Sequence, residues 1–174
     1  LIYVGLTVIC GLAYWYAGMS AFDAVCHSFA TLATGGFSTH DASIAWFNSP
    51  QIELIAVVFM FLAGASFSLH FLAWRSRTLA AYWGDPEFRA YALILISLTA
   101  AGTVTLFVSQ HYATVGESAR HALFHFVSFM TSTGFVATGF DQWPGALPLT
   151  LILVSFIGGC AGSTGGGMKV IRWL

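Results

Sequence analysis

Two long stretches of the chain are almost free of charged residues, and they limit the chain to the folds of membrane-spanning proteins. Ala90–Ser109 contains no charged side chain, and Ile52–Trp74 contains only Glu53, close to its start. Each stretch is about 20 residues long, which is the length of helix that crosses the hydrocarbon core of a membrane. Only 7% of the chain is charged, whereas a soluble domain carries about 25% charged residues. The sequence therefore predicts an all-α membrane protein.

The remaining composition argues against several classes of partner and cofactor. The net charge is −1, so nothing supports binding to nucleic acid. Cys10, Cys26 and Cys160 lie far apart, without the spacing of a metal site, so we expect buried free thiols. We also expect no organic cofactor in this chain. Residues 1–17 are apolar but start without methionine, and the chain stops abruptly at Leu174. We expect a piece of a longer membrane protein, without a signal peptide.

The basic residues predict which side of the membrane faces the cytoplasm. Arg75, Arg77 and Arg89 lie in one polar connection, and Lys169 and Arg172 follow two crossings later, which puts them on the same side. Because Lys and Arg accumulate in cytoplasmic loops, we expect this side to be cytoplasmic. The opposite side holds one basic residue and most of the acidic ones: Arg120, Asp23, Asp41, Glu117 and Asp141. An acidic outer face concentrates cations.

The chain aligns on itself without a gap when it is shifted by 98 residues. Of the 76 paired positions, 12 are identical, among them Gly36 with Gly134 and Pro50 with Pro148. The gapless register and the matched Gly and Pro positions indicate a true internal repeat.

The two repeats predict the same order of elements. In the first repeat, residues 1–80, we expect a first helix over 1–17, a pore helix over 20–33, a filter segment over 34–38 and a second helix over 50–75. In the second repeat, residues 81–174, we expect a first helix over 88–110, a pore helix over 118–131, a filter segment over 132–136 and a second helix over 146–172, broken at 158–167. The fold class is thus a tandem of helix–pore loop–helix units.

The short helices predict an ion filter. About 14 helical residues span about 21 Å, too little to cross, so each must enter from outside and return to the same side. The C-terminus of such a helix, which carries partial negative charge, then points at the membrane middle and favours a cation. The small residues that follow allow a ring of carbonyls to replace the hydration shell of the ion, with the two phenylalanines packed behind. The candidate potassium ligands are Thr34, Gly35, Gly36, Phe37, Ser132, Thr133, Gly134 and Phe135. The alternative is a tight turn between interfacial helices.

A glycine-rich run interrupts the last hydrophobic segment. Leu147–Ile157 forms about 16 Å of helix, so the break falls near the membrane middle, just inside the filter. The counterpart in the first repeat, Phe61–Phe71, is expected to stay helical, so the break is specific to one repeat. A mobile loop under the filter indicates a gate, and the alternative is a flexible kink. The candidate gate residues are Gly158, Gly159, Gly162, Ser163, Thr164, Gly165, Gly166, Gly167 and Lys169.

Enzyme motifs fit the glycine run poorly. Gly162 and Gly167 have the spacing of a phosphate-binding loop, but Lys169 is displaced by one residue and Val170 stands where Ser or Thr would hold magnesium. We therefore expect no enzyme. Gly-interrupted helices also occur in secondary transporters that couple one solute to another ion, and this remains the alternative function.

Four other side chains receive a structural interpretation. His27 and His125 occupy equivalent places in the two pore helices, so we expect each to bond a nearby backbone carbonyl. Arg120 is expected to pair with Glu117, three residues earlier. His70 has no evident partner in the sequence.

Several motifs together resemble a known family. The stretches FATLATGGFSTHDASI, YWGDPEFR, SFMTSTGFVATGF and FIGGCAGSTGGGMKVIR are similar to the Trk/Ktr/HKT superfamily of potassium transporters, above all to its bacterial TrkH/TrkG type. The resemblance covers essentially the whole chain, and its last motif is the most specific.

The resemblance implies a function and partners. It implies potassium uptake across the bacterial inner membrane, with pore loops that enter from the periplasm and a gate in the glycine run. Members have four such repeats around one pore, so this chain would hold two and need the other two. The filter glycine maps onto Gly134, whereas Gly35 and Gly36 compete in the first repeat and the repeat register favours Gly36. The resemblance also implies a homodimer and a cytoplasmic, nucleotide-binding regulatory subunit of the TrkA type.

Overall fold

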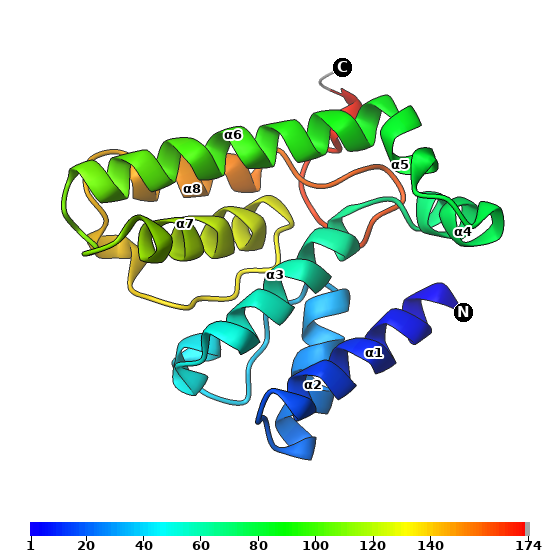
Figure 1. Cartoon of the computed structure of the whole chain (residues 1–174), viewed down its shortest axis with the longest axis horizontal. Coiled ribbons are helices and arrows are strands. Elements are labelled where there is room, and N and C mark those ends of the chain that lie inside the picture. The colour runs from blue at the N-terminus through cyan, green and yellow to red at the C-terminus, as the bar shows by residue number, and fades with distance from the viewer. Residues whose placement is uncertain (173–174) are drawn as a thin grey trace.

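The computed structural model describes residues 1–172, in which it contains helices and loops but no β-strand (Figure 1). Residues 173 and 174, at the end of the second predicted repeat, lie outside the described residues. The elements in chain order are α1 (Ile2–Tyr16), α2 (Ala21–Leu32), η1 (Ser43–Phe47), α3 (Pro50–Gly64), α4 (Phe67–Ser76), α5 (Ala80–Gly84), α6 (Pro86–Val108), α7 (Val115–Met130), η2 (Phe140–Gln142), α8 (Leu147–Ser155) and η3 (Val170–Arg172).

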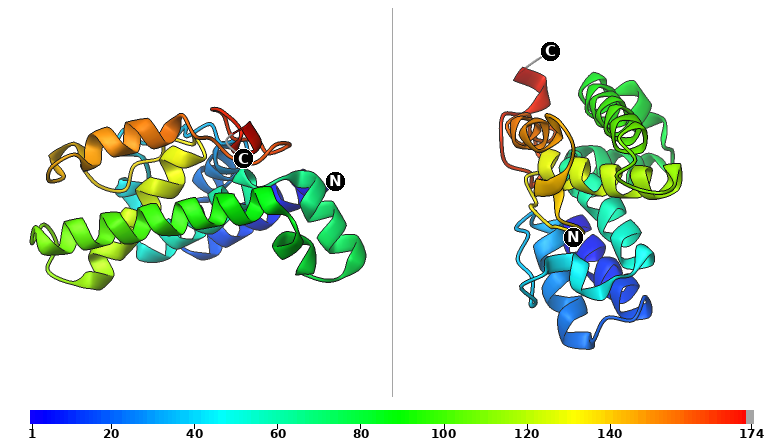
Figure 2. Two further views of the ribbon diagram at one scale, coloured as in Figure 1. Left: turned by 90° about the horizontal axis from the view of Figure 1, so that it is seen from above. Right: turned by 90° about the vertical axis from the view of Figure 1, so that its left-hand side faces the viewer.

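Two sets of three helices make up most of the molecule. In the first set α1 packs along α2, and in the second α6 packs along α7, which also contacts α8. Helix α3 crosses to α7 and joins the two sets, as Figures 1 and 2 show. Each set runs in the order long helix, short helix, second helix. This arrangement confirms the predicted fold class of tandem helix–pore loop–helix units.

Side-chain caps explain where the main helices start. The caps of α2, α3, α6 and α7 are Ser20, Ser49, Asp85 and Thr114, each of which accepts a backbone N–H of the first turn. Such a cap satisfies one of the N–H groups that the helix itself leaves without a partner. Helix α7 starts three residues before the predicted residue 118, because the Thr114 hydroxyl accepts the N–H of Glu117 at 3.2 Å and closes the first turn earlier.

The outward faces of several helices are apolar. Helix α6 is the one helix of the described residues that is by itself long and apolar enough to cross a membrane, and α3 with α4 passes the same test as a bent pair. Large apolar side chains of α1, α6 and α8 are exposed: Val4, Val8, Leu12, Leu93, Ile96, Val104, Leu149, Ile152 and Leu153. A surface of this kind is costly in water and suits contact with lipid or with further membrane helices.

The second helix of the first repeat is broken, so the prediction that Phe61–Phe71 stays helical is wrong. Helix α3 ends at Gly64, α4 begins at Phe67, and the two axes are bent by 96°. Ala65 and Ser66 between them have extended backbone angles. Local sequence gives little sign of this bend because groups distant in the chain bond the carbonyls that it frees. A break is therefore common to both repeats.

The second helix of the second repeat also differs from its prediction. Helix α8 ends at Ser155, before the expected break at 158, because Phe156 and Ile157 already close tighter turns onto Leu153 and Val154. After the glycines, only the short turn η3 forms within the described residues instead of a resumed helix. Residues 158–169, which lead from the end of this turn region to η3, are called the glycine loop below.

Candidate functional site

The two candidate filter segments, residues 34–38 and 132–136, follow the C-termini of α2 and α7 and share an unusual backbone pattern. Thr34 and Gly36 have φ of 50° and 66°, and Ser132 and Gly134 have φ of 59° and 83°. These are equivalent positions in the 98-residue register, and the residue between each pair has negative φ. Alternation of left-handed and ordinary residues turns successive carbonyls toward one side, as an ion filter requires.

The backbone pattern separates the two glycines that compete in the first repeat. Gly36 shares its positive φ with Gly134, and Gly35 does not. A Cβ at Gly36 would overlap the carbonyl oxygen of Thr133, so the two segments touch through their backbones. At Gly134 the same atom would meet nothing within 4 Å. Gly36 is thus required for both its φ and its close approach, and Gly134 for its φ alone.

Buried hydrogen bonds hold each segment to its helix. The backbone N–H of Thr34 donates to the carbonyl of Thr31 at 3.2 Å, and the Thr131 and Thr133 hydroxyls are 2.8 Å apart. Ser128 donates its hydroxyl to the carbonyl of Phe135 at 2.8 Å. These bonds fix the positions of the segment carbonyls relative to α2 and α7.

The two equivalent histidines bond backbone carbonyls, as predicted. Nδ1 of His27 bonds the carbonyl of Asp23 at 2.8 Å, and Nδ1 of His125 bonds that of His121 at 2.9 Å. Nε2 of His27 also meets the hydroxyl of Ser38, at the end of the first filter segment, at 2.9 Å. Each histidine therefore bonds the preceding turn of its own helix. In the first repeat, His27 also connects that helix to the segment 34–38.

The two filter phenylalanines are packed differently. Phe135 is fully buried and stacks on the ring of His27, with centroids 5.9 Å apart. Phe37 is 81% exposed, so the prediction that it packs behind its loop is wrong for the described residues. The reason is that His27, which covers Phe135, comes from the other repeat, and no residue of 1–172 takes that place beside Phe37.

The glycine loop lies against both filter segments. The Thr34 hydroxyl donates to the carbonyl of Thr164 at 2.9 Å. A Cβ at Gly165 would stand 3.1 Å from the carbonyl oxygen of Thr131, and one at Gly166 would stand 3.4 Å from the side chain of Ser132. Gly158 has φ of 67°, and a Cβ there would overlap the carbonyl of Gly166, so the loop also folds back on itself.

The same loop completes the broken α3. A helix leaves its last four carbonyls without partners, and in α3 these are Phe61, Leu62, Ala63 and Gly64. Gly64 accepts the N–H of Cys160 at 2.8 Å, and Ala63 accepts the N–H and the hydroxyl of Thr164 at 3.2 and 3.1 Å. The break in the first repeat is therefore stabilised by the break in the second.

The other two carbonyls of α3 are bonded by the side chains of His70 and of Tyr91, a residue that sequence analysis did not single out. The Tyr91 hydroxyl donates to Phe61 at 3.3 Å, and Nε2 of His70 bonds Leu62 at 2.9 Å. The other ring nitrogen of His70 meets the Tyr82 hydroxyl at 2.7 Å. His70 thus has two partners, although its sequence position suggested none.

Lys169 belongs to the glycine loop itself. Its Nζ donates to the hydroxyl of Ser163 at 3.3 Å and to the carbonyl of Gly165. Lys169 therefore bonds the residues on either side of Thr164, the loop residue that accepts the Thr34 hydroxyl.

An ion pair with a buried carboxylate joins the N-terminal parts of α3 and α7. Nε of Arg120 lies 3.5 Å from Oε2 of Glu53, whose side chain is 7% exposed. The predicted pairing of Arg120 with Glu117 is therefore wrong. The reason is the packing of α3 on α7, which brings Glu53 within reach and leaves Glu117 in solvent. The candidate acids near the filter mouths, Asp41 and Asp141, are exposed.

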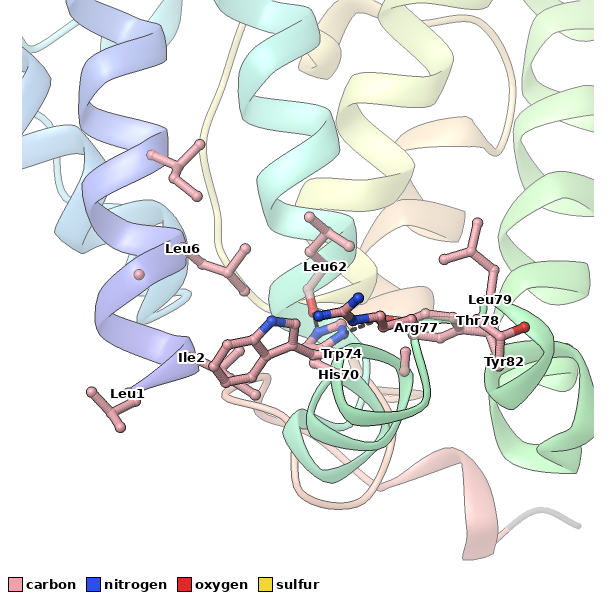
Figure 3. Close-up of a pocket in the computed structure, with 13 residues that line it drawn as sticks. Leu1, Ile2, Leu6, Leu62, His70, Trp74, Arg77, Thr78, Leu79 and Tyr82 are labelled. Carbon is pink, nitrogen blue, oxygen red and sulfur yellow. Dashed lines mark hydrogen bonds between the residues drawn. The ribbon is translucent and has the colours of Figure 1, made fainter.

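A separate apolar pocket of about 650 Å³ lies between α1 and the α4–α5 segment (Figure 3). Leu6 and Leu62 line it together with Trp74 and Tyr82. None of its lining residues belongs to a filter segment or to the glycine loop. The pocket is therefore not part of the candidate ion path.

Comparisons with known proteins match this geometry. The family model described as "TrkH: Cation transport protein" matches residues 1–174. A Trk system potassium uptake protein TrkH of Halomonas elongata is 54% identical over 98% of this chain and 35% of its own length, and that of Escherichia coli K12 is 49% identical over 100% and 36%. The crystal structure of the potassium transporter TrkH from Vibrio parahaemolyticus superposes with a TM-score of 0.95 at 50% identity, over 99% of this chain and 37% of that one.

The chain spans about a third of the length of these relatives. Both the sequence match over all residues and the structural match agree with the tandem helix–pore loop–helix fold. The chain belongs to the TrkH family of cation transport proteins.

Proposed function

We propose that this chain forms half of a potassium uptake pore, with residues 34–37 and 132–135 as two of its filter segments. The observation that carries the proposal is the repeated backbone pattern, positive φ at Thr34 and Gly36 and again at Ser132 and Gly134. Each copy follows the C-terminus of a short helix. The names of the relatives, Trk system potassium uptake proteins, point to the same ion.

The chemistry of the filter is the replacement of water by carbonyl oxygens. A potassium ion that enters loses hydration and gains backbone carbonyls of fixed position. The C-termini of α2 and α7 add partial negative charge that favours the cation. The exposed acids Asp41 and Asp141 raise the local cation concentration at the mouth. Each segment has one glycine of positive φ, Gly36 or Gly134. We therefore expect a short filter with few ion sites.

The glycine loop acts in this proposal as the gate. It lies against both filter segments, through Thr34, Thr131 and Ser132. Its glycines allow large backbone changes at low steric cost. Movement of the loop would open the path below the filter.

The complete protein needs parts that this chain does not contain. Two further repeats would close the pore, and the family resemblance supports a homodimer and a cytoplasmic nucleotide-binding subunit of the TrkA type. We place the protein in the bacterial inner membrane, with its filter loops entering from the periplasm and with Arg75, Arg77 and Arg89 on the cytoplasmic side.

The filter assignment is tested by Gly134→Ser in the full-length protein. The side chain disturbs the positive φ and the carbonyl positions, so we expect the preference for potassium over sodium to fall about tenfold, equal to about 1.4 kcal/mol of discrimination. Gly145→Ser is the matched control, because Gly145 also has positive φ (65°) and open space around it but lies outside both filter segments. Unchanged selectivity in Gly134→Ser would refute the assignment.

The alternative is a secondary transporter that couples cation entry to another ion. Broken second helices in both repeats suit this class as well. Flux in reconstituted vesicles under imposed gradients separates the two. A pore dissipates a potassium gradient without a second ion, whereas a coupled carrier moves potassium uphill when the gradient of the second ion drives it.

A further inference from the structure

A buried carboxylate at the start of α6 binds both ends of the glycine loop. Oε1 of Glu87 accepts the backbone N–H of Ala161 at 2.7 Å and that of Ile171 at 3.1 Å. Ala161 lies near the start of the loop, and Ile171 lies in η3 just after it. Figure 1 shows this end of the chain, in red, against the beginning of α6.

The two backbone N–H bonds are the main interactions that offset the cost of burying the Glu87 carboxylate. The residue is 8% exposed. Among residues 1–172, no basic nitrogen lies within 4.0 Å of its carboxylate. The cap of α6 is supplied by Asp85, which accepts the N–H of Phe88 at 2.7 Å, so Glu87 is not needed for that role. A buried carboxylate without a cation requires strong hydrogen bonds, and those to charged acceptors are the strong ones.

The glycine loop depends on hydrogen bonds to hold its shape. Its glycines lose much conformational freedom when they are fixed. Backbone bonds join its two ends, from the N–H of Met168 to the carbonyl of Phe156 at 2.9 Å and from the N–H of Val170 to the carbonyl of Gly159 at 3.2 Å. Its bonds to other elements, from Cys160 and Thr164 to α3 and from Thr34 to Thr164, engage the loop at residues 160–164. Glu87, which lies outside the loop, adds bonds to residues on both sides of Gly162–Gly167 and thereby reinforces the contact between the loop ends.

We propose that Glu87 is a clasp that holds the glycine loop in its blocking position. It is a positioning residue, and it touches neither the filter nor the ion. Release of Ala161 and Ile171 lets the loop ends separate, which withdraws the loop from the filter segments. This inference rests on the proposed function of the loop as a gate.

The test uses the full-length protein in vesicles and compares Glu87→Ala with Glu87→Gln. The amide of Gln keeps a carbonyl oxygen that accepts both N–H groups, and Ala keeps none. We expect Glu87→Ala to raise the basal potassium flux about tenfold and Glu87→Gln to stay within about twofold of the parent protein, where tenfold corresponds to about 1.4 kcal/mol. Glu117→Ala is the matched control, since Glu117 is a first-turn carboxylate of α7 that is exposed to solvent.

A second readout follows the loop without using flux. Cys160 lies at the start of the loop and is 1% exposed, so its alkylation requires the loop to move. With all other cysteines replaced, we expect a maleimide to label Cys160 about tenfold faster in Glu87→Ala than in the parent, Glu87→Gln or Glu117→Ala, and not at all in Cys160→Ser.

The two readouts distinguish the failure of the clasp from the failure of the gate. Faster labelling without increased flux in Glu87→Ala would support the clasp and contradict the gate. Unchanged labelling in folded Glu87→Ala would overturn the clasp. Equal acceleration in Glu87→Gln would overturn it as well, because that variant keeps the acceptor. If Glu87→Ala does not fold, a labelling rate of Glu87→Asp no higher than that of the parent overturns the clasp, since its shorter side chain cannot reach both N–H groups.

Discussion

The close approach at Gly36 gives a prediction that distinguishes it from its equivalent, Gly134. Both glycines have positive φ, which an L-residue adopts at a cost of about 1–2 kcal/mol. Gly36→Ala and Gly134→Ala therefore share this conformational cost. Only Gly36→Ala adds a steric conflict, because its Cβ would overlap the carbonyl oxygen of Thr133 from the other repeat.

The magnitude follows from the space available. Real Cβ atoms essentially never approach another heavy atom closer than 3.0 Å, and the conflict at Gly36 involves backbone on both sides. The two segments must therefore separate, by about 1 Å, and a displacement of about 1 Å in a positioned site costs about 10²-fold in rate. At Gly134 the Cβ enters open space, so φ strain alone applies. We expect Gly36→Ala to reduce potassium uptake about 100-fold, and Gly134→Ala about tenfold.

The assay is potassium and sodium uptake by vesicles that contain equal amounts of each full-length variant. Monodisperse elution in detergent confirms that both variants are folded. Equal uptake by Gly36→Ala and Gly134→Ala would refute the reasoning, because the steric term would then be absent. Stronger loss in Gly134→Ala would also refute it, since the added Cβ would then have to meet a neighbouring group.

Three further predictions concern hydrogen bonds and an ion pair outside the two filter segments. Removing the ring in His70→Ala takes a bond from the carbonyl of Leu62 and lowers the stability by about 1 kcal/mol; an unchanged melting temperature in detergent would contradict this. A double-mutant cycle of Glu53→Gln and Arg120→Gln should give a coupling of about 1 kcal/mol between α3 and α7; additive effects would show that the pair contributes nothing. The pKa of Asp23, in the first turn of α2, is lowered from 3.8 by two hydroxyl donors, Thr39 and Ser20, so its stabilising effect is present at neutral pH and is lost as the pH falls through the lowered value. Asp23→Asn should thus reduce the melting temperature more at pH 7 than at pH 3, and an equal reduction at both would contradict the assignment.

The sequence predicted those features that are written in local patterns or in the repeat. Hydropathy predicted α6. The 98-residue register made Gly36 equivalent to Gly134, and both glycines have positive φ. Equivalent histidines, His27 and His125, make the same bond to a backbone carbonyl. In each case a short stretch of chain, or its copy, contains the necessary information.

The errors share a different cause, which is contact between distant segments. The bend after Gly64 depends on the N–H groups of Cys160 and Thr164, about 100 residues later. The partner of Arg120 is Glu53, because helix packing and not chain proximity brings them together. Phe37 lacks the cover that Phe135 receives from the opposite repeat. None of these contacts leaves a signal in the neighbouring sequence.

The central claim is that residues 34–37 and 132–135 line the path of potassium. The most direct measurement is the anomalous scattering of rubidium, a potassium substitute, soaked into crystals of the full-length protein. We expect a peak within coordination distance of the carbonyl oxygens of both segments, between the C-termini of α2 and α7. Ordered rubidium elsewhere in the protein, with none at these carbonyls, would contradict it.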